Sequence, residues 1–167
     1  VYSGPVAGSA YARLAPVADR VRRVVLLGPA HRVPVRGLVA PRAQAFRTPL
    51  GDVPVDHALL SELADLPQIT LDDHAHAREH GLEVHLPFLQ SLLRDWRLVP
   101  FVVGAAPSAD VEAVLARCWG GPETLIVVST DLSHYLDAAS ARVIDAETAA
   151  AIEALDGHAI GSHAACG

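Results

Sequence analysis

Residues 24–31 read Val-Val-Leu-Leu-Gly-Pro-Ala-His, and the fold class can be approached from this segment. The first four residues are apolar, and Gly28 and Pro29 then end the apolar run. A short run of this kind predicts a strand buried on both faces, as the strands of parallel sheets are. Residues 98–103 and 124–128 have the same character. We therefore expect three buried strands in one sheet.

Segments with helical features separate these strands. Helices are expected at residues 6–20, 55–63, 108–118 and 138–155, and in a segment beginning near Leu86. Pro16 should trim or kink the first of them, and Pro87 fits the first turn of the segment that begins near Leu86. Asp56 and Ser108 are the expected caps of the helices at 55–63 and 108–118. Short strands and turns are expected at 35–54 and an edge strand at 68–71. This alternation predicts an α/β fold: a single domain with a central parallel or mixed sheet flanked by helices.

Composition excludes several classes of protein. The 167 residues are 51% apolar and 19% charged, so the chain can bury a core and is not intrinsically disordered. No apolar run approaches the roughly 20 residues of a membrane helix. Thirteen basic residues against nineteen acidic ones give a net charge of −6, which argues against nucleic acid or an anionic membrane as a partner. Two cysteines are too few for a disulfide framework, so we expect a cytoplasmic protein.

Two loops that follow predicted strands are candidate sites, because ligands of open α/β sheets bind at the carboxyl ends of strands. The first loop contains His31, which could equally be a capping or packing histidine. The second contains Asp131 and His134, three residues apart. A carboxylate that orients an imidazole suits general acid–base chemistry. The alternative is that Asp131 caps a turn and His134 is merely exposed.

The chain is rich in histidine, with nine in all, and several gather in one segment. This segment contains His74, His76, Glu79, His80, Glu83 and His85. Such a collection could ligate a metal, although it lacks the H-E-x-x-H spacing of metalloproteases. We expect His74 and His76 to be solvated loop residues and retain His80, Glu83 and His85 as candidate site lining.

The two cysteines differ in their surroundings. Cys166 lies among small residues, where a thiolate could act as a metal ligand or nucleophile. Cys118 precedes Trp119 on a predicted helix and fits the commoner role of a small buried hydrophobe. The sequence contains no glycine-rich phosphate loop and no G-x-S-x-G nucleophile motif.

A set of short motifs occurs in order along nearly the whole chain. The motifs are VYSG at 1–4, LLGPAHRVPV at 26–35, FRTPLGDVPVD at 46–56, EHGLEVHLPFLQ at 79–90, VPFVVG at 99–104, VVSTDLSHY at 127–135, AIEALD at 151–156 and ACG at 165–167. Together they resemble the Memo-like family, also called AmmeMemoRadiSam system protein B. The resemblance implies a fold like that of the catalytic subunit of LigB-type extradiol dioxygenases.

The resemblance also implies a non-haem metal pocket with two histidines and one cysteine as ligands. His31 and Cys166 match two of these ligands. The third is a histidine in a PHAGY motif that precedes VYSG in the family, so we expect residues 1–167 to be an incomplete Memo-like domain that lacks this segment and C-terminal strands. With two of three ligands, we expect this chain to bind iron or copper weakly or not at all. Asp131 and His134 match family residues beside the metal, with His134 at the position of a catalytic base. His85 matches a further family histidine near the pocket.

Several functions are compatible with this set of residues. A His/His/Cys site suits iron or copper and predicts an oxidoreductase, dioxygenase-like in character, acting on a small-molecule substrate. The cysteine departs from the 2-His-1-carboxylate triad of non-haem iron oxygenases. The alternatives are a non-catalytic binding or scaffold protein on the same fold, and metal-assisted hydrolysis. The family name implies a radical SAM enzyme and an AMMECR1-like protein as pathway partners.

Overall fold

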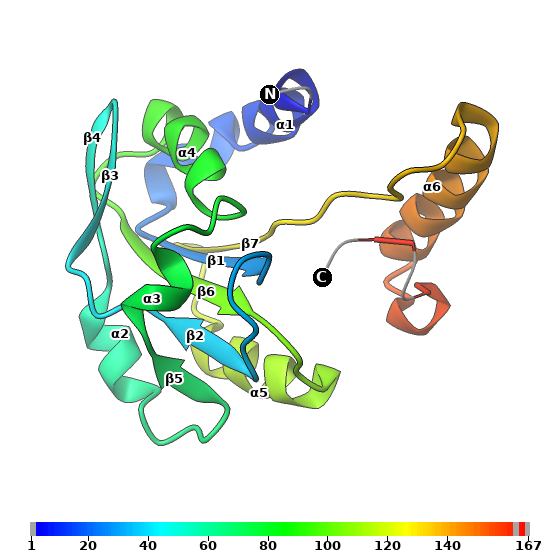
Figure 1. Ribbon diagram of the computed structural model, residues 1–167. Helices are drawn as coiled ribbons and strands as arrows, with labels where there is room; N and C mark the ends of the chain where they lie inside the picture. Colours follow the sequence, from blue (N-terminus) through cyan, green and yellow to red (C-terminus); the bar gives the residue numbers. More distant parts are fainter. Residues whose placement is uncertain (1–2, 162–163, 166–167) are drawn as a thin grey trace. The chain divides into compact units, whose positions relative to one another are not determined.

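A five-stranded mixed sheet organises the first part of the chain (Figure 1). Its strands are β1 (Arg23–Pro29), β2 (Leu38–Ala40), β5 (Ile69–Leu71), β6 (Arg97–Val103) and β7 (Thr124–Val128). They lie in the order β5-β2-β6-β1-β7, with β1 parallel to both β6 and β7. Strand β2 runs antiparallel to β6 and parallel to β5. The predicted α/β class with a mixed central sheet is therefore confirmed.

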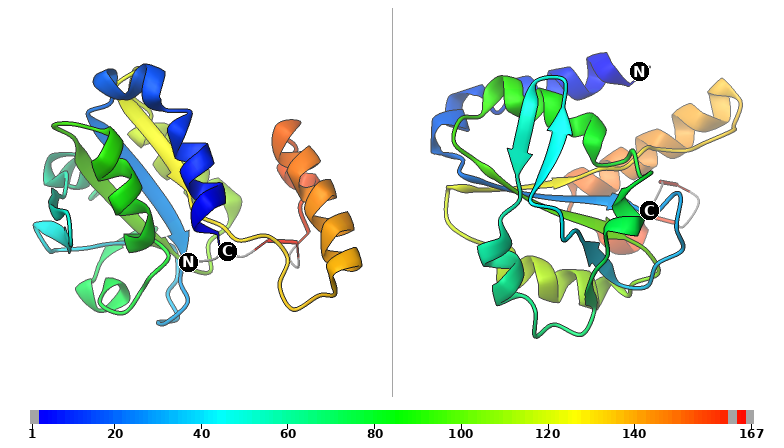
Figure 2. Two further views of the ribbon diagram at one scale, coloured as in Figure 1. Left: turned by 90° about the horizontal axis from the view of Figure 1, so that it is seen from above. Right: turned by 60° about the vertical axis from the view of Figure 1, so that its left-hand side comes forward.

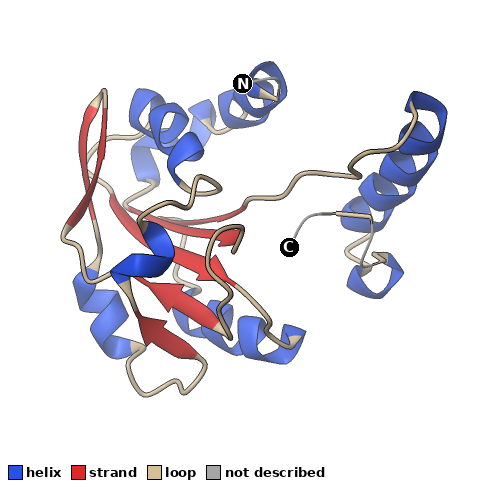
Figure 3. Cartoon of the chain, in the orientation of Figure 1, coloured by secondary structure: helices blue, strands red, loops and turns tan. Residues whose placement is uncertain are grey.

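The computed structural model describes residues 3–161 and 164–165. The chain divides into two compact units, Val1–Val128 and Ser129–Gly167, and each is described here by itself. The sheet belongs entirely to the first unit, as the strands of Figure 3 show. The second unit contains helix α6 (Ala138–Glu153) and the short 3-10 helix η3 (Gly157–Ala159).

Strand β1 is buried on both faces, which explains its uninterrupted apolar run. Because side chains alternate along a strand, Val24 and Leu26 face one hydrophobic cluster while Val25 and Leu27 face another. The first cluster includes residues of α1 (Gly4–Ala12), η1 (Ala15–Arg20) and α4 (Leu86–Leu92), and the second includes residues of α2 (His57–Glu62) and α5 (Ser108–Cys118). Helices thus cover both faces of the sheet (Figure 2).

The remaining elements of the first unit lie around this core. Strands β3 (Ala45–Thr48) and β4 (Gly51–Pro54) form a separate antiparallel hairpin. The four-residue helix α3 (Asp73–His76) and the 3-10 helix η2 (Glu83–His85) contain the first and last residues of the histidine-rich segment. Within the described residues, no helix has the length and apolar character needed to cross a membrane.

Two local predictions were wrong in detail. The helix expected over 6–20 is divided into α1 and η1, and Pro16 lies in the first turn of η1, where its missing N–H interrupts no helical bond. Ser108 is the first residue of α5 and not its cap, a position that Pro107 takes. Asp56, by contrast, caps α2 as expected, accepting a hydrogen bond from the Leu59 N–H at 3.2 Å.

Candidate metal centre at the end of strand β1

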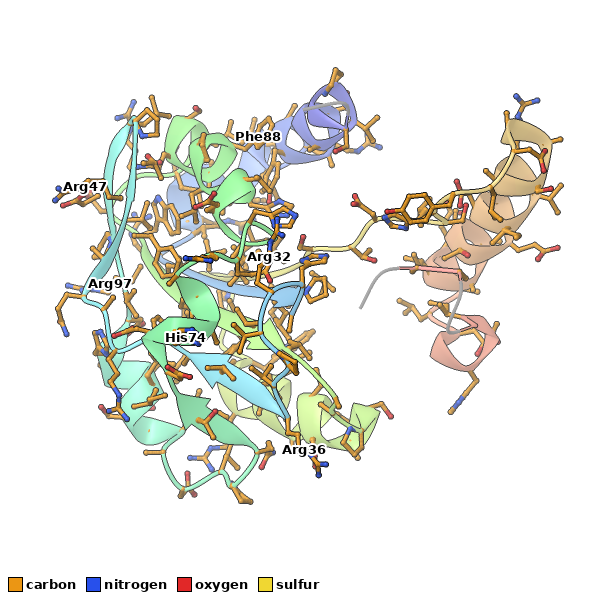
Figure 4. All side chains as sticks on the ribbon, viewed as in Figure 1. Arg32, Arg36, Arg47, His74, Phe88 and Arg97 are labelled. Carbon is orange, nitrogen blue, oxygen red and sulfur yellow. The ribbon has the colours of Figure 1, made fainter. Side chains whose placement is uncertain are left out.

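His31 lies two residues beyond the carboxyl end of β1, on the turn that continues into Arg32 (Figure 4). The segment between α3 and η2 contributes Glu79 and His80 to the same place. One candidate ligand atom from each of His31, Glu79 and His80 lies within 4.8 Å of the others. The site is therefore built from two segments that are 48 residues apart in the sequence.

Glu79 is the buried member of this group, with a side chain only 2% exposed. Its Oε2 accepts a hydrogen bond from the backbone N–H of His31 at 2.6 Å. Its Oε1 lies 2.8 Å from Nδ1 of the His31 ring and accepts the backbone N–H groups of His80 and Gly81, both at 2.9 Å. The carboxylate therefore fastens the turn after β1 to the segment after α3.

Hydrogen bonds keep the carboxyl group of Glu79 ionised in spite of its burial. Burial by itself raises the pKa of a carboxyl group, but the Gly81 N–H and both bonds from His31 lower the pKa of Glu79 to about 2. Glu79 is consequently ionised at neutral pH. The site presents a fixed negative charge beside two imidazoles, an arrangement that favours a cation.

The two histidine rings lie close together and reach the solvent. The ring centroids of His31 and His80 are 4.8 Å apart, with an angle of 30° between the ring planes. Their side chains are 32% and 51% exposed, so an ion or a small molecule can reach them from solvent. Imidazole nitrogens and carboxylate oxygens are ligands of zinc, iron and copper, and this group could hold such an ion.

The structure separates the residues that the histidine-rich segment suggested as site lining. His80 joins His31, whereas Glu83 is exposed on η2 and lies outside the three-residue group. His85 has its Nδ1 2.9 Å from the hydroxyl of Tyr11 on α1. The sequence placed Glu79 in the collection that could ligate a metal, but Glu83 and not Glu79 was retained as candidate site lining. The available signal was Gly81, which follows His80 directly and offers an N–H to the carboxylate without the bulk of a side chain.

The expectation for His76 was wrong. His76 lies on α3 and is partly buried, with Nε2 2.9 Å from the carbonyl oxygen of Val39 on β2. Its ring meets that of Phe46 edge to face, and burial lowers the pKa of His76. This residue therefore ties α3 to the sheet. His74, labelled on α3 in Figure 4, is exposed as expected.

The remaining predicted site residues belong to the second unit. Nε2 of His134 lies 3.7 Å from Oδ2 of Asp131, and the two side chains are 43% and 69% exposed. The pair is thus close enough for a charge interaction when the imidazole is protonated, and its catalytic role stays a prediction. Cys166 lies outside the described residues.

Two other features were weighed as sites. Cys118 is buried as expected, and burial raises the pKa of its thiol to about 11, which makes it inert. A concave surface of about 810 Å³ on α5 is mainly apolar, with Glu112 as its one titratable lining residue. It is lined by Ser108, Val111, Glu112, Leu115, Ala116 and Trp119. Among the described residues of the first unit, the group at the end of β1 is the one that brings candidate metal ligands together.

Comparison with known proteins supplies a family context for this site. Residues 1–164 match the family described as Memo-like protein. A MEMO1 family protein of Aquifex aeolicus is 34% identical over 160 residues, which cover 93% of this chain and 58% of the relative. The MEMO1 family protein MTH_45 of Methanothermobacter thermautotrophicus is 35% identical over 161 residues, 89% of this chain and 57% of the relative. The protein memo-1 homolog of Caenorhabditis elegans is 32% identical over 140 residues, 80% of this chain and 39% of the relative. The chain spans about half the length of these relatives.

Proposed function

Because the chain belongs to the Memo-like family, we propose that it forms the metal-binding part of a Memo-like protein, with His31 as a ligand at the end of β1. The observation that carries this proposal is the group of His31, His80 and the buried, ionised Glu79. Two imidazoles beside a fixed negative charge are a chemically suitable setting for a divalent cation.

The identity of the metal and the reaction are the finer parts of the proposal. Iron or copper fits a set of imidazole ligands completed by the Cys166 thiolate that the family resemblance implies. When bound, such a metal supplies redox chemistry toward oxygen and a small-molecule substrate. His134 serves in this proposal as the acid–base group, and Asp131 as the carboxylate that orients it. A LigB-dioxygenase-like fold and pathway partners of the radical SAM and AMMECR1-like types belong to the same proposal.

Metal titration tests the binding step directly. The family ligands alone predict weak or no binding by this chain, but His80 and Glu79 beside His31 lead us to expect that the metal-free chain binds about one equivalent of Fe²⁺ under anaerobic conditions. Isothermal titration calorimetry and elemental analysis measure this binding. His31→Ala removes a ligand, so the affinity for Fe²⁺ should fall by roughly 100-fold or more. This loss is larger than the one typical when a residue that only hydrogen-bonds to a ligand is replaced. His74→Ala is the matched control, because His74 is exposed on α3 and outside the group. Equal affinity of the His31→Ala variant and the unaltered chain would contradict the assignment.

Oxygen consumption tests the reaction. The iron-loaded chain is mixed with catechol, a small phenolic probe, in an oxygen electrode. We expect uptake above that of free iron, and a reduced rate for His134→Ala at unchanged iron content. Iron binding without oxygen uptake would remove the dioxygenase-like part of the proposal. Absence of both would favour the alternative of a non-catalytic binding or scaffold protein.

A further inference from the structure

The four shortest contacts of Glu79 define its role more closely than its membership of the metal-binding group does. Two of them go to one residue, His31: the backbone N–H at 2.6 Å and the ring Nδ1 at 2.8 Å. The other two come from the backbone N–H groups of His80 and Gly81. A carboxylate held at both oxygens in this way fixes the position and the rotation of the His31 ring.

Most of the capacity of the carboxylate for further partners is used, with three N–H donors at Oε1 and one at Oε2. An ionised carboxylate has about four lone-pair sites, and Glu79 accepts four N–H groups. Its side chain is 2% exposed, so solvent and ions have little access to it. A metal ion bound at Oε1 would have to displace at least one of its donors, and one bound at Oε2 would have to share that oxygen with the backbone N–H of His31. Glu79 differs in its access to solvent from the neighbouring imidazoles of His31 and His80, whose side chains are 32% and 51% exposed.

The contact with the ring also selects the tautomer of His31. A carboxylate can only accept, so Nδ1 must carry the hydrogen that it shares with Glu79 Oε1. In a neutral imidazole the lone pair then resides on Nε2. Histidine ligands of metals are commonly oriented in this manner by a carboxylate on the other ring nitrogen.

We propose that Glu79 is a positioning residue rather than a metal ligand: it holds His31 in the Nδ1–H tautomer and directs Nε2 to the metal. The part of this inference that concerns metal rests on the proposed function. The part that concerns the tautomer applies to the metal-free chain as well. The two parts are therefore tested by separate measurements.

Nitrogen-15 NMR of the histidine-labelled, metal-free chain measures the tautomer. At a pH where the imidazoles are neutral, we expect the His31 spectrum to show a protonated Nδ1 and an unprotonated Nε2, assigned by comparison with His31→Ala. In Glu79→Gln, the amide group cannot accept at both positions, so the tautomers of His31 should become mixed. Glu83→Gln is the matched control, because Glu83 is exposed and lies outside the group. A protonated Nε2 in the unaltered chain would overturn the proposal without any variant.

Titration with Co²⁺, followed by its visible absorption, measures the consequence for metal binding. We expect Glu79→Gln to weaken Co²⁺ binding by about 10–100-fold, the usual effect of losing an orienting partner, and Glu83→Gln to leave it unchanged. Weaker Co²⁺ binding by Glu79→Gln with an unaltered His31 tautomer would instead make Glu79 a ligand and refute the positioning role. Failure of the unaltered chain to bind Co²⁺ or Fe²⁺ would refute the proposed function, while the tautomer measurement would still decide the role of Glu79. If Glu79→Gln does not fold, Glu79→Asp, whose shorter side chain cannot keep all four bonds, gives the same comparison.

Discussion

Replacement of Glu79 by Gln should change how the stability of the metal-free chain depends on pH. The native pKa of Glu79 is about 2, against an ordinary value of 4.5. A carboxyl group whose pKa is lower in the folded state stabilises the fold above the unfolded value, and this stabilisation is lost as the pH falls toward the native value. The lowered pKa of Glu79 adds about 3 kcal/mol to the free energy of unfolding at pH 7, and about 2 kcal/mol of this stabilisation is lost by pH 3. Glu79→Gln has no titrating group at this position, so this component of its pH dependence disappears.

Urea unfolding at pH 7 and pH 3, in the presence of a chelator, measures the effect. With a urea dependence of roughly 2 kcal/mol per molar, the gap between the midpoints of the unaltered chain and Glu79→Gln should narrow by about 1 M at the lower pH. Subtraction of the two curves removes the contributions of the titrating groups that do not contact Glu79, which leaves Glu79 and its neighbours His31 and His80. Glu83→Gln removes an exposed carboxylate, so its urea midpoints at both pH values should lie closer to those of the unaltered chain. A gap of constant size between pH 7 and pH 3 would refute the reasoning about Glu79.

Three further predictions concern the scaffold. Phe101→Ala removes a fully buried ring from β6 and should lower the free energy of unfolding by about 3–5 kcal/mol in urea; a loss below about 1 kcal/mol would contradict the packing. Gly104→Ala would place a Cβ against the backbone oxygen of Val35, so Tm should fall by at least about 3 °C. The control Gly4→Ala meets no atom within 4 Å, and equal Tm values for the two variants would count against the close approach at Gly104. Because burial raises the pKa of Cys118 to about 11, its thiol should resist alkylation at pH 8 until urea unfolds the chain. Peptide mass spectrometry measures the labelling, and rapid labelling of Cys118 in the native protein would disprove its burial.

The strands β1 and β6 could be predicted from sequence because burial on both faces leaves a clear pattern, and the expected strands beginning at residues 24 and 98 lie within them. The expected strand at 124–128 coincides with β7 in its bounds, but its predicted burial was wrong, because β7 lies at the edge of the sheet and is only partly buried. The direction of β2 could not be predicted in this way. Its three residues are all buried, as in a parallel strand, yet it pairs antiparallel to β6. Apolar periodicity reports how deeply a strand is buried and carries no information about the route by which the chain reaches its neighbour.

The site was only partly predictable for a related reason. The position of His31 after a strand indicated a functional loop, since strand ends are where ligands bind in such sheets. The choice between Glu79 and Glu83 depends on which side chain turns inward, and two carboxylates four residues apart look alike in a sequence. The structure distinguishes them by burial: Glu79 is 5% exposed and receives four N–H donors, whereas Glu83 is exposed.

The candidate site therefore combines imidazoles with a carboxylate that stays ionised in more acidic solution. Metal-binding histidines must be neutral, so protons compete with a metal for the imidazoles of His31 and His80. The pKa of Glu79, about 2, keeps the orienting carboxylate ionised throughout the range in which imidazoles ordinarily titrate. If the imidazoles bind a metal as proposed, acid would compete for them while the ionised Glu79 still accepts the backbone N–H groups of His31, His80 and Gly81. The connection between the two segments would therefore not depend on the metal.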